Sequence, residues 1–407
     1  MNPSHALRAA AVAAALLLPA SALFAQAPES VRPEVGKPLQ AAQKLIAEKK
    51  FKEALAEVAK LDGSKLTPYE AFVTEQMRGT AASGAGDSAL AMKAFEAVLA
   101  SGKLTGENRL KLMEAVAGTA LRSKDYAKSL EWLGKYRSEG GKNPITLGLI
   151  PQAYYLAGQF AQSAKESAAL LAARESTGGK PTEDEIKLLA SAYVKQKDMA
   201  GYALALEQML RYYPKQEYWA DAIQRTAARP GFSDRLVIDM YRLLRATGTL
   251  EGSKDYMEMA QLAVQAVLLG EAQAIIDEGY AKKVLGTGAE AERQQRLKKL
   301  IETRLTQDKQ ELAATDAAAA AAASGEPLIR TGLAYVTYGE TTKGLALMEQ
   351  GLKKGGLKKP EEAKLRLGFA HYLAGDKAKA VQVFKTVGGK DGAADLARLW
   401  ILVCSRG

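Results

Sequence analysis

The sequence predicts an all-α protein built from repeated helical hairpins, and two observations support this. Hydrophobic residues make up 47% of the 407 residues and aromatic residues 7%, so the core must consist mainly of Ala and Leu, which lose little entropy in helices. The gaps between recurring small residues are 37, 38, 34, 39, 73, 69 and 36, so the two largest gaps each contain one poorly matching unit. These small residues mark expected helix crossings at Ala42, Gly79, Ala117, Pro151, Ala190, Ala263, Gly332 and Gly368.

Residues 365–387 carry the repeat most clearly, as two short stretches joined at Ala374-Gly375-Asp376. The Leu, Gly, aromatic, Ala and Phe positions of a tetratricopeptide repeat correspond here to Leu367, Gly368, His371, Ala380 and Phe384. The chain therefore resembles an exported bacterial member of the tetratricopeptide repeat family, whose period is about 34 residues. The resemblance implies a right-handed α-solenoid superhelix whose concave groove binds a protein or peptide.

The first 25 residues have the features of a signal peptide. Arg8 supplies the positive charge, residues 9–18 are apolar, and small residues lead to a cleavage site after Ala25, with Ala22 and Ala27 as alternatives. The apolar run is shorter than the roughly 20 residues that span a bilayer, which disfavours the alternative of a membrane anchor. We expect a periplasmic or secreted protein with no membrane span after cleavage.

The rest of the chain is expected to form five successive parts. A flexible leader (26–37) precedes an N-terminal repeat array (38–286), in which 217–248 forms two helical stretches broken at Pro230-Gly231. The charged, then Ala-rich segment 287–324 should form two long helices or one bent helix, with a flexible linker as the alternative. Two further tetratricopeptide repeats (325–391) and a capping helix (392–407) complete the chain.

Candidate binding residues follow from the resemblance. The resemblance implies that eight residues face the groove: Arg122, Gln152, Tyr155, Lys187, Ser191, Lys195, Phe369 and Tyr372. Aromatic and Arg side chains dominate binding hot spots, so Arg122, Tyr155, Lys195 and Tyr372 are the predicted contacts. The alternatives are core packing for the tyrosines and a solvated position for the lysine. The carboxylate clamp of cochaperones is not expected, because Asn2, Asn108 and Asn143 are the only asparagines and none has a matching position.

The net charge of +10 comes from 56 Lys and Arg against 46 Asp and Glu. Its clusters look local, and nucleic acid is not expected as a partner of an exported protein. A protein or peptide partner in cell-envelope assembly or export is the main expectation. An anionic envelope polymer or another glycan is the alternative partner, because Lys and Tyr also suit acidic sugars.

Residues for catalysis are scarce. His5 leaves with the signal peptide, so His371 is the only histidine of the expected mature chain, and its position in the repeat is one for core packing. A histidine metal site needs more than one such ligand, and no nucleophile elbow or complete phosphate loop occurs. We expect no catalytic residue, no cofactor and no metal; an enzyme on a repeat platform is the remaining alternative. Cys404 should be a small apolar residue of the last helix, or else form an intermolecular disulfide.

Overall fold

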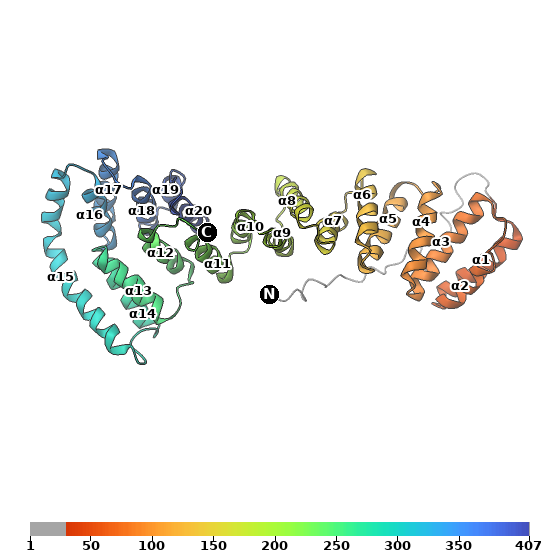
Figure 1. Ribbon diagram of the computed structural model, residues 1–407, viewed down its shortest axis with the longest axis horizontal. Coiled ribbons are helices and arrows are strands. Elements are labelled where there is room, and N and C mark those ends of the chain that lie inside the picture. The colour runs from red at the N-terminus through yellow and green to blue at the C-terminus, as the bar shows by residue number, and fades with distance from the viewer. Residues whose placement is uncertain (1–29, 407) are drawn as a thin grey trace. The chain divides into compact units, whose positions relative to one another are not determined.

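The computed structural model describes residues 30–406, and the predicted signal peptide lies outside them (Figure 1). The described residues contain twenty α-helices, one short 3-10 helix and no strand, which confirms the all-α prediction. Two compact units divide the chain, unit 1 (Met1–Tyr202) and unit 2 (Ala203–Gly407).

Unit 1 is an open row of helical hairpins. Each second helix contacts the first helix of the next hairpin, and α1 contacts α3, α5 contacts α7 and α7 contacts α9. This stacking of neighbours along the chain is the arrangement of an α-solenoid. Its helices are α1 (Pro33–Ala47), α2 (Phe51–Ala59), α3 (Pro68–Ala85), α4 (Ser88–Ala100), α5 (Gly106–Arg122), α6 (Tyr126–Ser138), α7 (Pro144–Leu156), α8 (Phe160–Ser176), α9 (Glu183–Gln196) and α10 (Met199–Tyr212), the last of which contains the unit boundary.

One turn geometry recurs in every hairpin. The second helix begins two residues after a residue with positive φ. This residue adopts the left-handed backbone conformation and ends the first helix, so that the chain can reverse its direction. The intervening residue is often an Asp whose carboxylate accepts a hydrogen bond from the backbone N–H three residues later, as Asp87, Asp125 and Asp376 do. The positive-φ turn residues are Lys49, Gly86, Lys124, Gly158, Lys197, Val267, Gly339 and Gly375.

The two helices of a hairpin cross where the sequence places small residues. The crossing residue lies seven positions before the positive-φ residue, and a second small residue often lies five positions after it, as in the pair Ala42 and Ala54, both fully buried. A Cβ atom at Gly79 would lie 2.4 Å from the Phe95 ring, and one at Gly368 would lie 2.5 Å from the Phe384 ring. Close approach at these crossings therefore requires glycine.

The predicted crossing at Ala263 is shifted by one helical turn. Val267 is the turn residue of its hairpin, so the crossing lies at Ala260, and the buried Ala272 occupies the corresponding small-residue position of the second helix. Ala260 and Ala263 are both fully buried on the same face of one helix, and spacing alone could not distinguish them.

The N-terminal helix begins earlier than expected. Helix α1 starts at Pro33, inside the predicted leader 26–37, because a proline suits the first turn of a helix and Arg32 anchors this end to α3. The Arg32 backbone N–H and guanidinium both donate to the buried Glu70 carboxylate, at 3.0 and 2.8 Å. The Arg32 side chain and two backbone N–H groups hold the pKa of Glu70 well below its ordinary value.

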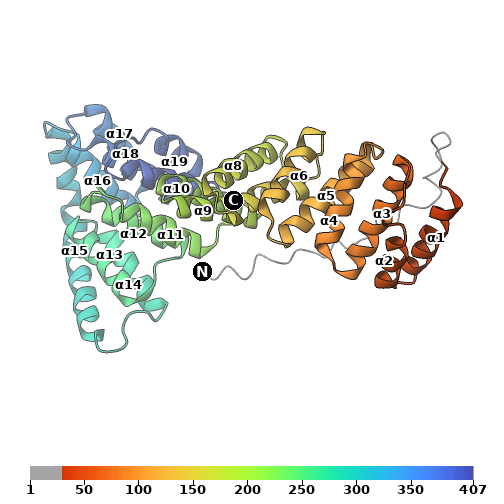
Figure 2. The same cartoon turned by 45° about the vertical axis from the view of Figure 1, so that its right-hand side comes forward.

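Unit 2 contains three hairpins of the same kind and four other helices. The hairpins are α13/α14, α16/α17 and α18/α19, and the single helix α15 lies between two of them, in contact with both α14 and α16 (Figure 2). The bounds are α11 (Gln216–Ala227), α12 (Val237–Thr247), α13 (Gly252–Gln265), α14 (Leu269–Ala281), α15 (Ala291–Ala321), α16 (Glu326–Thr337), α17 (Thr341–Lys354), α18 (Pro360–Leu373), α19 (Lys377–Phe384) and α20 (Ala393–Cys404).

The charged and Ala-rich segment is a single helix. Helix α15 runs for 31 residues, and no Gly or Pro occurs within it to break the backbone hydrogen bonds. One of the two predicted forms, two helices, is therefore wrong, and so is the flexible-linker alternative. The helix fills the interval between hairpins α13/α14 and α16/α17 without a turn.

The last helix closes unit 2 upon its beginning. Helix α20 contacts α18 and α19, as a capping helix should, and it also contacts α11 and α12. The Ser233 backbone N–H donates to the Asp391 carbonyl at 2.9 Å, and Arg229 pairs with Asp395 at 2.5 Å. Trp400 lies fully buried at this junction, 5.8 Å from the Phe384 ring. The last helix of unit 2 thus packs against the first helices of the same unit, whereas unit 1 is an open row of hairpins.

A buried ion cluster holds α12, α14 and α18 together. The Arg242 guanidinium donates to Asp239 at 2.5 Å and to Glu271 at 2.6 and 2.7 Å, and all three side chains are at most 3% exposed. The Phe369 ring lies 4.6 Å from this guanidinium, and Arg366 reaches Asp239 at 3.4 Å. Burial lowers the pKa of Arg242, but the two carboxylates outweigh it and the net shift is upward. Arg242 is therefore charged in the core.

We predict that Arg242→Met destabilises unit 2 by about 3–5 kcal/mol, because it leaves two buried carboxylates without their cation. In a Trp132→Phe background the remaining tryptophans, Trp219 and Trp400, both report unit 2, so urea unfolding followed by fluorescence measures the effect. Arg245→Met is the matched control. Its pair with Glu278 is partly exposed, and its loss should cost at most about 1 kcal/mol. Equal losses in the two variants would contradict the prediction.

We predict that Val267→Gly stabilises unit 2 by roughly 0.5–1 kcal/mol. Val267 is β-branched and has a φ of 57°, and a left-handed backbone costs a residue with a Cβ about 1–2 kcal/mol. Glycine relieves this strain, but it loses more backbone entropy on folding, which offsets part of the gain. The reverse change at the equivalent turn, Gly339→Val, should destabilise unit 2 by about 0.5–1 kcal/mol, since a Cβ at Gly339 contacts nothing within 4 Å and the same backbone strain and entropy difference act with opposite sign. Fluorescence-detected urea unfolding would show both shifts, and a stability of V267G at or below that of the wild type would contradict this account of the turn.

Candidate functional site

Three predicted binding residues lie close to hairpin turns of unit 1. Arg122 and Lys195 precede the left-handed turn residue of their hairpin by two positions, and Tyr155 precedes its own by three. Arg122, Tyr155 and Lys195 lie in the last turns of α5, α7 and α9, just before the hairpin turn. Each hairpin returns the chain to its starting side, so these successive first helices run in the same direction and their last turns lie at one edge. We call this surface the turn edge: the last turns of α5, α7 and α9 and the hairpin turns that follow them.

Neighbouring turns contact each other along the turn edge. The Tyr155 ring packs edge-on against Phe160, with the ring centroids 5.3 Å apart, and the Gln196 side-chain amide donates to the Phe160 carbonyl at 3.1 Å. The turn after α7 is thereby joined to the end of α9. This contact holds the half-buried Tyr155 ring in a fixed position.

The turn edge combines exposed apolar and cationic side chains. Its large apolar residues in the α7–α10 region are Leu156, Val194 and Met199, which are 45, 43 and 47% exposed. The exposed Arg122 guanidinium donates to the Thr119 hydroxyl at 2.9 Å, and neither Arg122 nor Lys195 forms an ion pair within residues 30–406. Such a surface suits a partner that offers both apolar and acidic side chains.

The two predicted residues of unit 2 have a different environment. Phe369 was expected to face the groove, but it is only 6% exposed and lies between Arg242 and Trp400, because unit 2 closes over this face of α18. Tyr372 is half-buried 4.8 Å from the Trp400 ring, and burial raises the pKa of its hydroxyl. A binding role for Tyr372 stays a prediction, and packing against Trp400 is its visible contact.

His371 is a core residue. It is 5% exposed, neither ring nitrogen has a hydrogen-bond partner, and the closest acidic atom is a Glu349 oxygen 3.9 Å from Nε2. Burial is the largest influence on its pKa and lowers it from the ordinary 6.5, while Glu349 and Asp376 oppose this weakly. The imidazole is therefore neutral near pH 7 and fills an aromatic packing position.

The described residues provide no arrangement for metal binding. No group of three or more His, Cys, Asp or Glu side chains within residues 30–406 could hold a metal ion. Burial raises the pKa of the Cys404 thiol to about 11, so this buried cysteine is a poor nucleophile at neutral pH. No helix in the same part of the chain is both long and apolar enough to cross a membrane.

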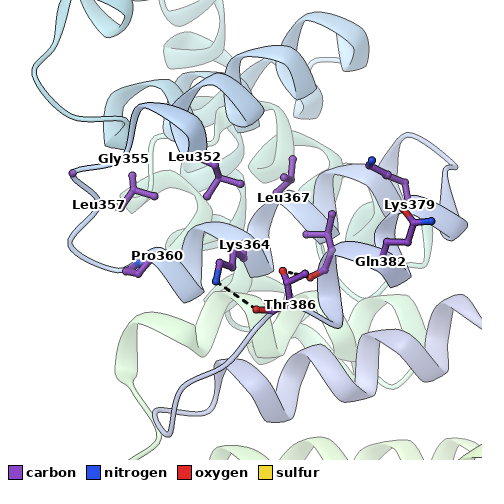
Figure 3. A pocket seen from close by; sticks show the side chains of 11 residues that line it. Leu352, Gly355, Leu357, Pro360, Lys364, Leu367, Lys379, Gln382 and Thr386 are labelled. Carbon is purple, nitrogen blue, oxygen red and sulfur yellow. Dashed lines mark hydrogen bonds between the residues drawn. The ribbon is translucent and has the colours of Figure 1, made fainter.

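A hollow that the sequence reasoning missed lies in unit 2. It has a volume of about 690 Å³ and is bounded by α17, α18 and α19, with Leu352, Leu367 and Lys379 among its lining residues (Figure 3). The density of lysines between 353 and 390 is the sequence feature that could have indicated it.

Comparison with known proteins gives matches of low similarity among solved structures. No family model matches the sequence, and no curated protein matches it. Among solved structures, a tetratricopeptide repeat protein from Parabacteroides merdae is 11% identical, with 82% of this chain and 99% of that chain covered and a TM-score of 0.30. The C-terminal part of a tetratricopeptide repeat-containing protein from Cytophaga hutchinsonii is 16% identical, covers 63% and 98%, and has a TM-score of 0.32. The TPR2AB domain of yeast Sti1, in its complex with pHSP90, is 11% identical, covers 73% and 99%, and has a TM-score of 0.26.

These values are too low to carry over a partner or an activity. The class of the chain rests on its own geometry. Its hairpins turn through a left-handed residue and cross at small side chains, with phenylalanine rings packed on Gly79 and Gly368. The chain is built of tetratricopeptide-type helical hairpins.

We predict that the stability of unit 2 falls as the pH is lowered from about 7.5 to 5.5. The pKa of His371 is lower in the folded protein than its ordinary 6.5, so below pH 6.5 the unfolded chain binds the proton more tightly and folding loses free energy. His371→Phe keeps an aromatic ring and should abolish most of this slope in urea unfolding followed by tryptophan fluorescence. An unchanged slope in H371F would show that another group is responsible.

Proposed function

We propose that this protein is an exported scaffold that binds a protein or peptide partner through the turn edge of unit 1. The observation that supports this most directly is the alignment of Arg122, Tyr155 and Lys195 with exposed Leu156, Val194 and Met199. Exposed apolar side chains that recur at one edge of a repeat array mark an interaction surface. A tyrosine ring and an arginine at such a surface are typical binding hot spots.

The row of hairpins explains how one surface can be continuous across several repeats. Each hairpin adds one first helix, and each of these three helices adds one of the three side chains in its last turn. A partner can therefore contact several repeats at once, with apolar contact from Leu156 and Val194 and charge from Arg122 and Lys195. The two cations have no acidic partner within the described chain, which favours a partner segment that carries carboxylates.

The place of action is part of the proposal. Residues 1–25 have the pattern of a signal peptide, which favours a role outside the cytoplasm, in cell-envelope assembly or export. A binding role also suits the chemistry of the described residues, where the carboxylates with lowered pKa values, such as Glu70 and Glu278, are engaged in ion pairs.

We predict that the triple variant Arg122→Ala, Tyr155→Ala, Lys195→Ala loses at least tenfold in affinity for partners captured from an envelope extract of cells that produce the protein. The loss follows from the removal of three neighbouring contacts, of which an aromatic and an arginine can each contribute about 2 kcal/mol. The measurement is capture on the immobilised wild type, identification of the bound proteins, and titration of each purified protein against both variants.

The matched control is Arg137→Ala, Lys165→Ala, which also removes two cations but from the second helices α6 and α8. It should bind as the wild type does. Equal affinities of the triple variant and the wild type would remove the turn edge from the proposal. Capture of a soluble anionic polysaccharide in place of a protein would favour a glycan-binding role.

A further inference from the structure

The hollow in unit 2 has an apolar floor between two second helices. Leu352 belongs to α17 and Val383 to α19. The buried Leu367 belongs to α18, and Leu357 lies in the loop between α17 and α18. Figure 3 shows Leu357, Leu352 and Leu367 in a row, with Pro360 near one end and Lys379 and Gln382 at the other. A volume of about 690 Å³ lies within the range of about 300–1,000 Å³ that is usual for ligand sites. It can accept several apolar side chains.

The chain segment that contains this hollow is strongly basic. Residues 352–390 contain ten Lys and Arg against three Asp and Glu, so this short segment holds +7 of the chain's net charge of +10. Lys364 and Lys379 line the hollow, and the exposed lysines next to a lining residue in the chain are Lys353, Lys354, Lys358, Lys359 and Lys385.

The acidic residues of the same segment are already engaged within unit 2. Glu361 accepts a hydrogen bond from Lys364 at 2.8 Å and another from the Gly388 backbone, and Glu362 pairs with Arg366 at 2.8 Å and Arg235 at 3.2 Å. The Asp376 carboxylate caps α19. In contrast, neither Lys379 nor Lys385 forms an ion pair within the described residues. Lys379, which lines the hollow, therefore carries a positive charge that no ion pair within the described residues neutralises.

We propose that this hollow is a docking site for an acidic peptide segment of a partner protein, one that combines Leu-like side chains with Asp and Glu. The apolar floor takes up the Leu-like side chains, and the lysines in and beside the hollow pair with the carboxylates. The site lies on the second helices of unit 2, so it is separate from the turn edge of unit 1 and gives the scaffold a second binding position.

Other anionic occupants fit the site less well. Nucleic acid bases are commonly bound by stacking on aromatic rings, and no aromatic residue is among the lining residues. A membrane surface is bound by apolar side chains that project outward with cations around them, whereas the leucines here line a hollow, in which Leu367 is buried. Carboxylates carried on an apolar peptide match both features.

Fluorescence anisotropy with the full described chain, residues 30–406, tests the proposal. The probe is a fluorescein-labelled twelve-residue peptide of Glu, Asp and Leu, compared with one in which Gln replaces every Leu. We expect saturable binding of the first peptide and at least tenfold weaker binding of the second. The charge-reversal variant Lys379→Glu, Lys385→Glu, which changes two exposed side chains, should also bind the first peptide at least tenfold more weakly.

The matched control is Lys254→Glu, Lys299→Glu, which makes the same charge change on exposed residues of α13 and α15. It should stay within about twofold of the wild type, because salt at 0.15 M screens charges beyond about 8 Å. The turn-edge triple variant R122A/Y155A/K195A should bind the probe normally. The docking site in unit 2 can therefore be disproved while the turn edge of unit 1 remains a binding surface, and the turn edge can be disproved while the docking site remains.

Three results would overturn the proposal: no saturable binding up to about 1 mM peptide, equal weakening in both charge-reversal variants, or equal binding of the Leu and Gln peptides. Preferential binding of phosphatidylglycerol vesicles, lost in K379E/K385E while the peptide does not bind, would also overturn it and assign these lysines to a membrane surface.

Discussion

The hairpin turn is the constraint on which the rest of the structure depends. In each hairpin, one residue with left-handed backbone is followed by the residue at the N-terminus of the second helix, which fixes where that helix begins. It also fixes where the two helices cross, which is at the residue seven positions before the left-handed residue. Small side chains at the crossing then allow the two helices to approach closely. Repetition of this turn places the last turns of α5, α7 and α9 at one edge, which gives unit 1 its candidate binding surface.

Unit 2 uses the same hairpin for a different result. The uninterrupted α15 replaces one hairpin, and α20 contacts α11 and α12, so the last helix of the unit packs against its first helices. Polar groups buried inside this closed unit must find their hydrogen-bond partners within it. Arg242 and its two carboxylates meet this need at the cost of desolvating three charges. Closure also explains why Phe369 is buried.

The sequence predicted the repeats well because their determinants are local. Gly79, Gly368 and the phenylalanines sixteen residues later are visible as a pattern, and the structure places them in direct contact. The start of α1 was placed too late, because its anchor, the pair of Arg32 with Glu70, joins residues 38 positions apart. The closure of unit 2 and the Arg242 cluster could not be predicted for the same reason, since their contacts join segments distant in the sequence. The placement of Arg122, Tyr155 and Lys195 in the last turns of first helices followed from the repeat pattern, while the hollow depends on how three helices pack.

The central claim is that partners bind along the turn edge of unit 1, and photo-crosslinking tests it most directly. Benzoylphenylalanine would replace Leu156 or Val194 at this edge, and Ile145, which is 80% exposed at the opposite end of α7, would serve as the reference position. The account predicts that the same partner is crosslinked in cells from positions 156 and 194 and not from 145. Equal or stronger crosslinking from 145, or unrelated products from 156 and 194, would contradict it.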